Sequence, residues 1–290
     1  MRPLGNEKRH AVAGYLFILP WLAGFLALKA WPFFYSLSLS FMNVKITTTG
    51  IRTIPAGIEN YTAAFLSDVQ FTSELLVAVR NLALSTPVIL VFSLLIALLI
   101  NYPSRLKGVF RTVFFLPVII TSGPVIKELV TQGAATVPSM EKYGFYNIIK
   151  ANLAPAWAEP ITYLFTQIIV ILWFSGVQIL IFLAGLQKIN TSMYEAARID
   201  GASAWEIFWK VTLPELRPLI VVNAVYTIVT LATFAQNDVM LTIQDAMFRV
   251  GQGFGYAAAL AWIHFVVIAA ALGVAVLVIG TGRTRRRRDA

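Results

Sequence analysis

The segment Asn190–Pro218, NTSMYEAARIDGASAWEIFWKVTLPELRP, is a polar stretch that lies between two long apolar ones. It contains two capping boxes, Ser192-x-x-Glu195 and Ser203-x-x-Glu206. In such a box the Ser hydroxyl accepts a hydrogen bond from the backbone N–H three residues later, and the Glu carboxylate accepts one from the N–H of the Ser. The segment therefore predicts two short helices, each begun by its own cap.

Other residues of this segment indicate where the two helices end and what they expose. Gly201 follows the first helix, where a glycine in the left-handed conformation commonly ends a helix. We expect Leu213-Pro214 to break the second helix after about Val211, because Pro lacks an N–H and its ring clashes with the preceding turn. Small or apolar side chains lie among the polar ones: Ala196, Ala197, Ile199, Trp205, Phe208 and Trp209. They predict either a docking surface for a partner or packing at the lipid interface.

Composition indicates that the bilayer is the solvent for most of the chain. The 290 residues are 58% hydrophobic and only 13% charged, whereas a soluble domain carries about 25% charged residues. Because the chain has no Cys, it has no disulfide, thiolate metal site or Cys nucleophile. His10 lies in a basic tail and His264 in an apolar run, so we expect no His-based metal centre.

Six apolar stretches are long enough to cross the hydrocarbon core, which takes about 20 residues of helix. They predict an all-α integral membrane protein with six transmembrane helices, at 12–42, 81–100, 112–130, 161–186, 216–236 and 256–281. The first stretch contains Pro20, Lys29 and Pro32, so we expect it to be bent.

Positive charge predicts the side of each loop, because cytoplasmic loops carry an excess of Lys and Arg. An even number of spans places both termini on one side. If that side is the cytoplasm, 15 of the 23 basic residues lie inside: Arg2, Lys8, Arg9, Arg105, Lys107, Arg111, Lys188, Arg198, Lys210, Arg217, Arg283, Arg285, Arg286, Arg287 and Arg288. Seven lie outside, in or near the loops 43–80 and 131–160 and at Arg249, and Lys29 lies within the first span. We therefore expect cytoplasmic termini and a basic C-terminal tail that binds anionic lipid.

The loop resembles a known family motif. Glu195-Ala196-Ala197, Gly201 and Leu213-Pro214 are spaced as in the EAA loop of permease subunits of binding-protein-dependent ABC importers. The longer string, from Glu195 to Pro218, is similar to the carbohydrate branch, the maltose-type permeases, with Val211 where the family pattern has Ile. The segments 57–65, 110–126 and 234–242 also resemble this family, whereas the Gly-Gly-Pro run of one permease type is absent.

This resemblance implies a six-helix type I permease fold in the bacterial inner membrane. The implied divisions are a cytoplasmic tail at 1–11, a permease domain at 12–281 with the coupling loop at 190–214, and a basic cytoplasmic tail at 282–290. The implied partners are a second EAA-type permease, two copies of a cytosolic ABC ATPase, an external solute-binding protein and a carbohydrate. The residues expected to couple to the ATPase are Glu195, Ala196, Ala197, Asp200, Gly201, Ala202, Leu213 and Pro214.

The same resemblance implies a transport subunit rather than an enzyme. The chain has no GxxxxGK[ST] phosphate loop, so ATP and Mg are expected on the partner ATPase, with no cofactor in this chain. Carbohydrates are bound by hydrogen-bonding side chains and aromatic faces. Candidates to line the pathway in the fourth and fifth spans are Gln167, Trp173, Ser175, Gln178, Asn223, Thr227, Thr230 and Thr233. Hydroxyls in membrane helices also bond their own backbone or mediate helix packing, so a packing role stays open.

Three alternative functions stay open. The first is a permease of the same architecture for an amino acid, a peptide or a phosphate ester. The second is a membrane-embedded enzyme, which would need acids, His or Cys within the membrane, and the predicted spans are nearly free of them. The third is a membrane scaffold, which would not need a double-capped loop. Copurification with an ATPase separates the permease from the last two.

The predicted topology can be tested with a single Cys, because the chain has none of its own. Ala202→Cys places a thiol in the loop expected to be cytoplasmic. In intact cells this thiol should resist membrane-impermeant maleimides and react only after the cells are opened. Ready labelling in intact cells would contradict the topology.

Overall fold

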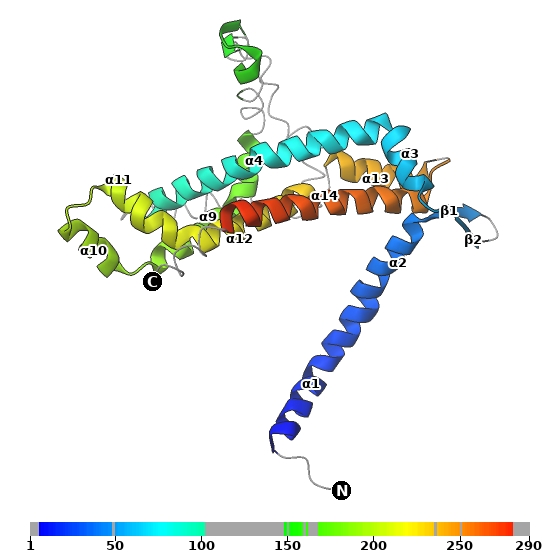
Figure 1. The fold of residues 1–290 in the computed structure, drawn as a ribbon, viewed down its shortest axis with the longest axis horizontal. Helices are drawn as coiled ribbons and strands as arrows, with labels where there is room; N and C mark the ends of the chain where they lie inside the picture. Colours follow the sequence, from blue (N-terminus) through cyan, green and yellow to red (C-terminus); the bar gives the residue numbers. More distant parts are fainter. Residues whose placement is uncertain are drawn as a thin grey trace. The chain divides into compact units, whose positions relative to one another are not determined.

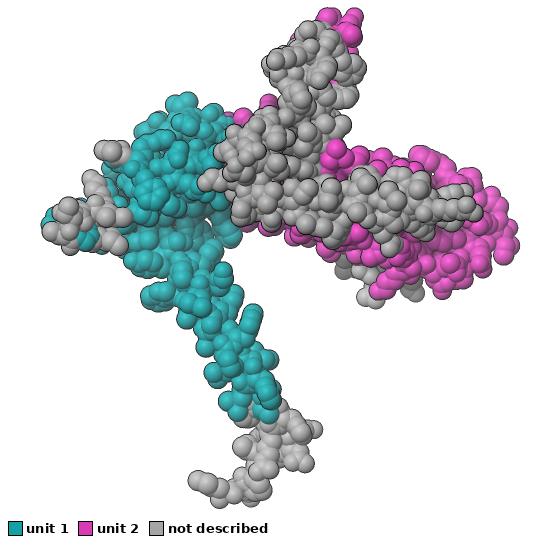
Figure 2. Space-filling view, turned by 180° about the vertical axis from the view of Figure 1, so that it is seen from behind, with its two compact units in different colours: residues 1–75, 238–266 teal, residues 76–237, 267–290 magenta. Residues whose placement is uncertain are grey.

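The computed structural model describes residues 6–47, 50–101, 148–149, 151–158, 161, 168–234, 237–249 and 251–280. They form an almost entirely helical chain (Figure 1). The chain divides into two compact units, residues 1–75 with 238–266 and residues 76–237 with 267–290 (Figure 2). The predicted third span, 112–130, lies outside the described residues.

The first unit begins with one continuous helix (Figure 1). It comprises α1 (Asn6–Phe25), a π-helical turn (Leu26–Ala30) and α2 (Trp31–Ser40). In the wide turn the N–H of Trp31 donates to the carbonyl of Leu26. This turn comes directly before Pro32, whose ring would crowd a regular α-helix. The structure has a π turn in this stretch, which was expected to be bent, and α1 begins within the predicted tail 1–11.

The predicted outer loop 43–80 is not a loop. It holds an antiparallel hairpin of β1 (Met42–Thr47) and β2 (Gly50–Pro55), in which Met42 pairs with Pro55. Helix α3 (Glu59–Leu66) follows, and then the start of α4 (Val69–Asn101). A side-chain oxygen of Asp68 accepts from the N–H of Phe71 at 2.9 Å and so caps α4. Because of this cap the helix begins well before the apolar stretch 81–100.

Two glycines fit the hairpin against the C-terminal part of the first unit. Helix α13 (Asp238–Phe248), which the sequence did not predict, leads by a short turn into α14 (Phe254–Gly280). A Cβ on Gly255 would lie 1.8 Å from the carbonyl oxygen of Met42, and one on Gly253 would lie 2.6 Å from that of Val44. The side chain of any larger residue at Gly253 or Gly255 would therefore overlap the backbone of β1.

The second unit is built on α9 (Ile168–Lys188), α10 (Thr191–Ile199), α11 (Ala204–Ile207) and α12 (Leu213–Ala232), with most of α4 and the end of α14. Helix α9 packs on α12. One apolar core of this unit consists of Ala97, Ile100, Ile179, Phe182, Leu183, Leu186 and Leu216. Gly185 lies against Leu216 and Leu219, so α9 and α12 approach each other closely there.

Four helices in the described part of the chain are long and apolar enough to cross a membrane: Ala13–Ser40, Val69–Asn101, Ala204–Ala232 and Phe254–Gly280. They correspond to the first, second, fifth and sixth predicted spans. Of the fourth predicted span the structure describes residue 161 and then Ile168 onward, and the apolar part there is Phe174–Lys188. The first of the four helices has no buried residues within its apolar window, and Phe17 is 87% exposed. This surface is suited to lipid or to another helix rather than to water.

The glycine contact with the hairpin predicts a difference between two substitutions in the same helix. Gly255→Ala should destabilise the protein by about 1–3 kcal/mol, because a methyl group would be forced onto the carbonyl of Met42. Gly273→Ala in α14 is the control, since a Cβ there meets nothing within 4 Å. This control should be neutral or stabilising by up to about 1 kcal/mol. Thermal unfolding of both variants in detergent would test this, and equal stability would contradict the packing.

Candidate functional site

The first helix of the predicted coupling loop has its own cap. The N-cap of α10 is Asn190, whose Oδ1 accepts from the N–H of Ser192 at 3.0 Å. The predicted capping box Ser192-x-x-Glu195 is therefore wrong. Asn is as good an N-cap as Ser and comes earlier in the chain, so Ser192 lies within the first turn. Glu195 lies in the middle of α10 with its side chain exposed.

The end of α10 is formed by Gly201, which has a φ of +78°. Its N–H donates to the carbonyl of Arg198 at 3.0 Å, and the N–H of Ala202 donates to that of Ala197 at 2.9 Å. These bonds satisfy carbonyls that the last helical turn would otherwise leave free. The predicted left-handed glycine is confirmed. A Cβ on Gly201 would meet nothing within 4 Å, so a substitution there acts through the backbone conformation alone.

The second capping box is confirmed. Ser203 Oγ accepts from the N–H of Glu206 at 3.3 Å, and Glu206 Oε2 accepts from the N–H of Ser203 at 3.0 Å. The other carboxylate oxygen of Glu206 accepts from Lys210 Nζ at 3.1 Å. The turn that begins α11 is therefore fixed by side chains of the loop itself.

The expected break at Leu213-Pro214 is wrong. Helix α11 continues through a π-helical turn (Phe208–Thr212) directly into α12. In this turn the N–H of Leu213 donates to the carbonyl of Phe208. Pro214 lies in the first turn of α12, where its missing N–H costs least. The wide turn therefore keeps the chain helical from Ala204 to Ala232.

The loop exposes apolar side chains. Ile199 is 86% exposed and Trp205 69%. The ring centroids of Trp205 and Trp209 are 5.5 Å apart, and those of Phe208 and Trp209 are 5.2 Å apart. The predicted coupling residues all lie in this loop; Glu195, Ala196, Asp200, Gly201 and Pro214 are exposed, and Ala197, Ala202 and Leu213 are partly so. The arrangement provides a capped, partly apolar surface on two linked helices.

The predicted pathway residues separate into three groups. Gln167 lies outside the described residues, and Trp173 lies in α9. Ser175 and Gln178 of α9, with Asn223 and Thr227 of α12, are fully buried. Thr230 and Thr233 are at least partly exposed, and their hydroxyls donate to carbonyls of their own helix, those of Tyr226 and Val229. The three threonines therefore do not share one environment, although their spacing predicted a common face.

Three of the buried residues form a polar seam, Gln178–Asn223–Thr227, between α9 and α12, whereas the hydroxyl of Ser175 donates to the carbonyl of Ile171 in its own helix. Gln178 Nε2 donates to Thr227 Oγ1 at 2.8 Å, and that hydroxyl donates to the carbonyl of Asn223 at 2.7 Å. Asn223 Nδ2 donates to the carbonyl of Gln178 at 3.4 Å. Gln178 Oε1 and Asn223 Oδ1 are buried and accept no hydrogen bond from the described residues. In this conformation the seam joins two helices and is closed to a solute.

Further features of the site were not predicted from the sequence. Arg217 Nε donates to the carbonyl of Ile279 at 2.8 Å and so joins the start of α12 to the end of α14. Tyr194 and Thr212 are 3.3 Å apart between hydroxyls and tie α10 to the π turn. Neither of these contacts has a signal in the sequence. The Asn190 cap, also not predicted, has one, because Asn before a helix is a common N-cap. Within the described residues no cluster of three His, Asp or Glu side chains could hold a metal ion.

Comparison with known proteins identifies the family. The model of the binding-protein-dependent transport system inner membrane component matches residues 61–286, which include the whole loop. The chain belongs to this family. The resemblance seen in the EAA loop is thereby confirmed. The permease family fold is likewise shared with a solved bacterial alginate ABC transporter, in complex with its alginate pentasaccharide-bound periplasmic protein, at a TM-score of 0.61 and 20% identity over 94% of this chain and 96% of that one.

Several curated relatives of this permease carry descriptive names. The probable ABC transporter permease protein YesP of Bacillus subtilis is 32% identical over 92% of this chain and 90% of the relative. The lactose transport system permease protein LacF of Rhizobium radiobacter is 27% identical over 91% and 92%. The trehalose/maltose transport system permease protein MalF of Thermococcus litoralis is 30% identical over 74% and 72%. The relatives are transport components rather than enzymes.

The polar seam of this permease predicts a difference between two threonines of α12. Thr227→Val removes the acceptor of Gln178 Nε2 and leaves a buried donor unpaired, which should cost about 1–3 kcal/mol of stability. Thr230→Val is the control, because its hydroxyl bonds only its own helix. It should change stability by less than about 0.5 kcal/mol. Unfolding in mixed detergent micelles would test the difference, and equal losses would refute a packing role for the seam.

Proposed function

We propose that this chain is the permease subunit of an ATP-driven importer that carries a carbohydrate delivered by an external solute-binding protein. The observation that carries the proposal is the family match over residues 61–286, which covers both the loop and the helices around it. Relatives named for lactose, trehalose/maltose and arabinooligosaccharides support a carbohydrate as the substrate.

The proposed assembly has two permeases, two cytosolic ATPase subunits and one binding protein, with ATP and Mg on the ATPases. The structural neighbour in complex with a periplasmic protein supports the external partner. In this chain the proposal includes six membrane helices at 12–281, cytoplasmic tails at 1–11 and 282–290, and insertion in the bacterial inner membrane. The Lys and Arg distribution supports cytoplasmic termini.

The proposed coupling element is the loop 190–214, with Glu195, Ala196, Ala197, Asp200, Gly201, Ala202, Leu213 and Pro214 in contact with the ATPase. Ala196 and Ala197 allow close approach to the backbone of α10. Ile199, Trp205 and Trp209 supply exposed apolar area for a groove of the partner. The caps at Asn190 and Ser203 keep both helices formed without the partner. Docking therefore does not require these helices to form, which would lower the conformational entropy of the loop.

Movement of the loop would reach the membrane through one rigid element. Because the chain is helical from Ala204 to Ala232, a displacement at Trp205 moves Asn223 and Thr227 as well. The seam between α9 and α12 contains two acceptors, Gln178 Oε1 and Asn223 Oδ1, that lack a described partner. If the ATPase separates α9 from α12, these groups become available to sugar hydroxyls. The pathway that we propose therefore includes Ser175, Gln178 and Thr227, with Thr230 and Thr233 beyond them and Gln167 and Trp173 earlier in the chain.

Substitutions in the loop test the coupling. Gly201→Asp introduces a Cβ at a φ of +78° and changes the angle between α10 and α11. Sugar uptake should fall at least tenfold, while the variant stays in the membrane and the ATPase is released or hydrolyses ATP without transport. The matched control is Gly57→Asp, at another exposed glycine, with a φ of +55° and no neighbour within 4 Å of a Cβ.

Charge reversal provides an independent test of the same loop. Glu195→Lys should reduce uptake and ATPase copurification, because it removes a carboxylate that would face a basic partner. Glu141→Lys, in the predicted outer loop, should leave the ATPase attached. Normal transport by both Gly201→Asp and Glu195→Lys, with the ATPase still bound, would show that this loop does not couple.

A further inference from the structure

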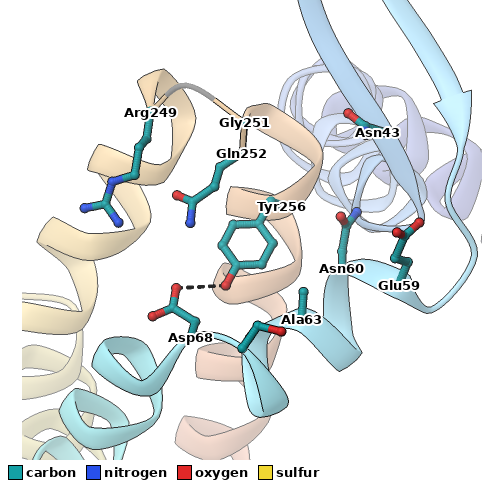
Figure 3. Close-up of a pocket in the computed structure, with 10 residues that line it drawn as sticks. Asn43, Glu59, Asn60, Ala63, Asp68, Arg249, Gly251, Gln252 and Tyr256 are labelled. Carbon is teal, nitrogen blue, oxygen red and sulfur yellow. Dashed lines mark hydrogen bonds between the residues drawn. The ribbon is translucent and has the colours of Figure 1, made fainter.

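The first unit contains a polar cavity of about 430 Å³ (Figure 3). It shares no residue with the coupling loop or with the polar seam. Its walls are Asn43, Glu59, Asn60, Ala63, Ser67, Asp68, Arg249, Gly251, Gln252 and Tyr256. The volume lies in the range of about 300–1,000 Å³ that is usual for small-molecule sites.

Hydrogen bonds hold the walls of the cavity in place. Asn60 Nδ2 donates to the carbonyls of Ser40 and Met42, at 2.9 and 3.1 Å, and thus fixes α3 against the end of α2 and the start of β1. Tyr256 donates its hydroxyl to Asp68 Oδ2 at 2.8 Å, as Figure 3 shows. Asp68 also caps α4. The cavity is therefore pre-organised, because its polar walls are fixed without a ligand.

Two acceptors in the cavity have no hydrogen-bond partner among the described residues. Asn43 Oδ1 and Gln252 Oε1 are both buried and accept no hydrogen bond from the described part of the chain. A buried acceptor without a donor is unfavourable, and most such groups in proteins have a partner. A ligand that carries hydroxyl or other donor groups would satisfy both once these side chains turn their oxygens into the cavity. In Figure 3 the side chain of Gln252 lies between those of Arg249 and Tyr256.

The charges around the cavity limit the ligand to a neutral one. Glu59 and Asp68 disfavour an anion, and Arg249 disfavours an isolated cation. A sugar hydroxyl can donate to the carboxylates and amide oxygens and accept from the guanidinium. A neutral polyhydroxyl compound therefore fits the charged and the uncharged polar groups of the wall.

We infer that this cavity is a subsite of the permease for one unit of a neutral carbohydrate. The inference rests on the proposed function, and on the predicted topology, which places Asn43, Glu59 and Arg249 on the outer side. There the subsite would hold the sugar before it enters the membrane helices. It selects neutral sugars over uronates, unlike the structural neighbour that imports the acidic polysaccharide alginate.

Protection of a single Cys tests the subsite directly. Ser67→Cys places a thiol in the cavity wall of the otherwise Cys-free chain, and Thr62→Cys on exposed α3 is the control outside it. Each full-length variant is placed in lipid nanodiscs, and its rate of reaction with a maleimide is measured. The probes are maltose, lactose, trehalose, arabinotriose and alginate pentasaccharide. At least one neutral sugar should slow the maleimide reaction of Ser67→Cys several-fold and leave that of Thr62→Cys unchanged. Alginate pentasaccharide should slow neither reaction.

A second variant tests the unpaired acceptor. Gln252→Met keeps the length of the side chain but removes its oxygen, so it should abolish sugar protection of Ser67→Cys. The unchanged rate of Thr62→Cys in the same background would show that α3 is still folded. Protection that survives Gln252→Met would overturn the assignment of that acceptor.

The outcomes also separate the subsite from the proposed function. If the assembled transporter imports a neutral sugar but none of the four slows Ser67→Cys, the subsite is wrong and the proposed function stands. Equal protection by alginate pentasaccharide would overturn the selection for neutral sugars. If only the solute-binding protein of the proposed importer protects the thiol, the cavity is a protein-docking site and the sugar subsite is refuted.

Discussion

The whole structure depends on the need to pair every backbone N–H and carbonyl within the bilayer, where no water can replace a lost hydrogen bond. This constraint explains how the chain accommodates two of its prolines. Before Pro32 and Pro214 the helix widens into a π turn instead of ending, so that the hydrogen-bonded path along the backbone continues. The rod from Ala204 to Ala232, on which the proposed coupling depends, is a direct result.

The sequence predicted those parts of the structure that depend on near neighbours. Apolar stretches indicated the spans, and Gly201 and Ser203 indicated two turns of the loop, because both devices act within a few residues. The rule that a proline ends the preceding helix was wrong at Leu213-Pro214, because the helix continues through a π turn there. Neither the approach of Gly255 to Met42 nor the Gln178–Thr227 bond could be predicted, because the partners are far apart in the chain.

Packing and recognition draw on the same side-chain chemistry in this protein. The amides and hydroxyls of the seam between α9 and α12 are chemically suited to sugars, and yet they bond to each other in this conformation. The cavity of the first unit differs, because its polar walls are fixed and two of its acceptors have no partner in the described part of the chain. The polar groups of the seam thus close on one another, whereas those of the cavity line an open space.

The interactions that shape the loop between α9 and α12 are made mostly by residues of the loop itself. Asn190 and Ser203 cap its helices, Gly201 turns the chain, and the aromatic residues contact each other. Its conformation is therefore encoded almost wholly within its own residues. The surface of such a segment can change in sequence without changes in the membrane helices. The whole segment could also be exchanged between permeases. If the loop couples to the ATPase as proposed, substrate choice and choice of ATPase can then evolve separately.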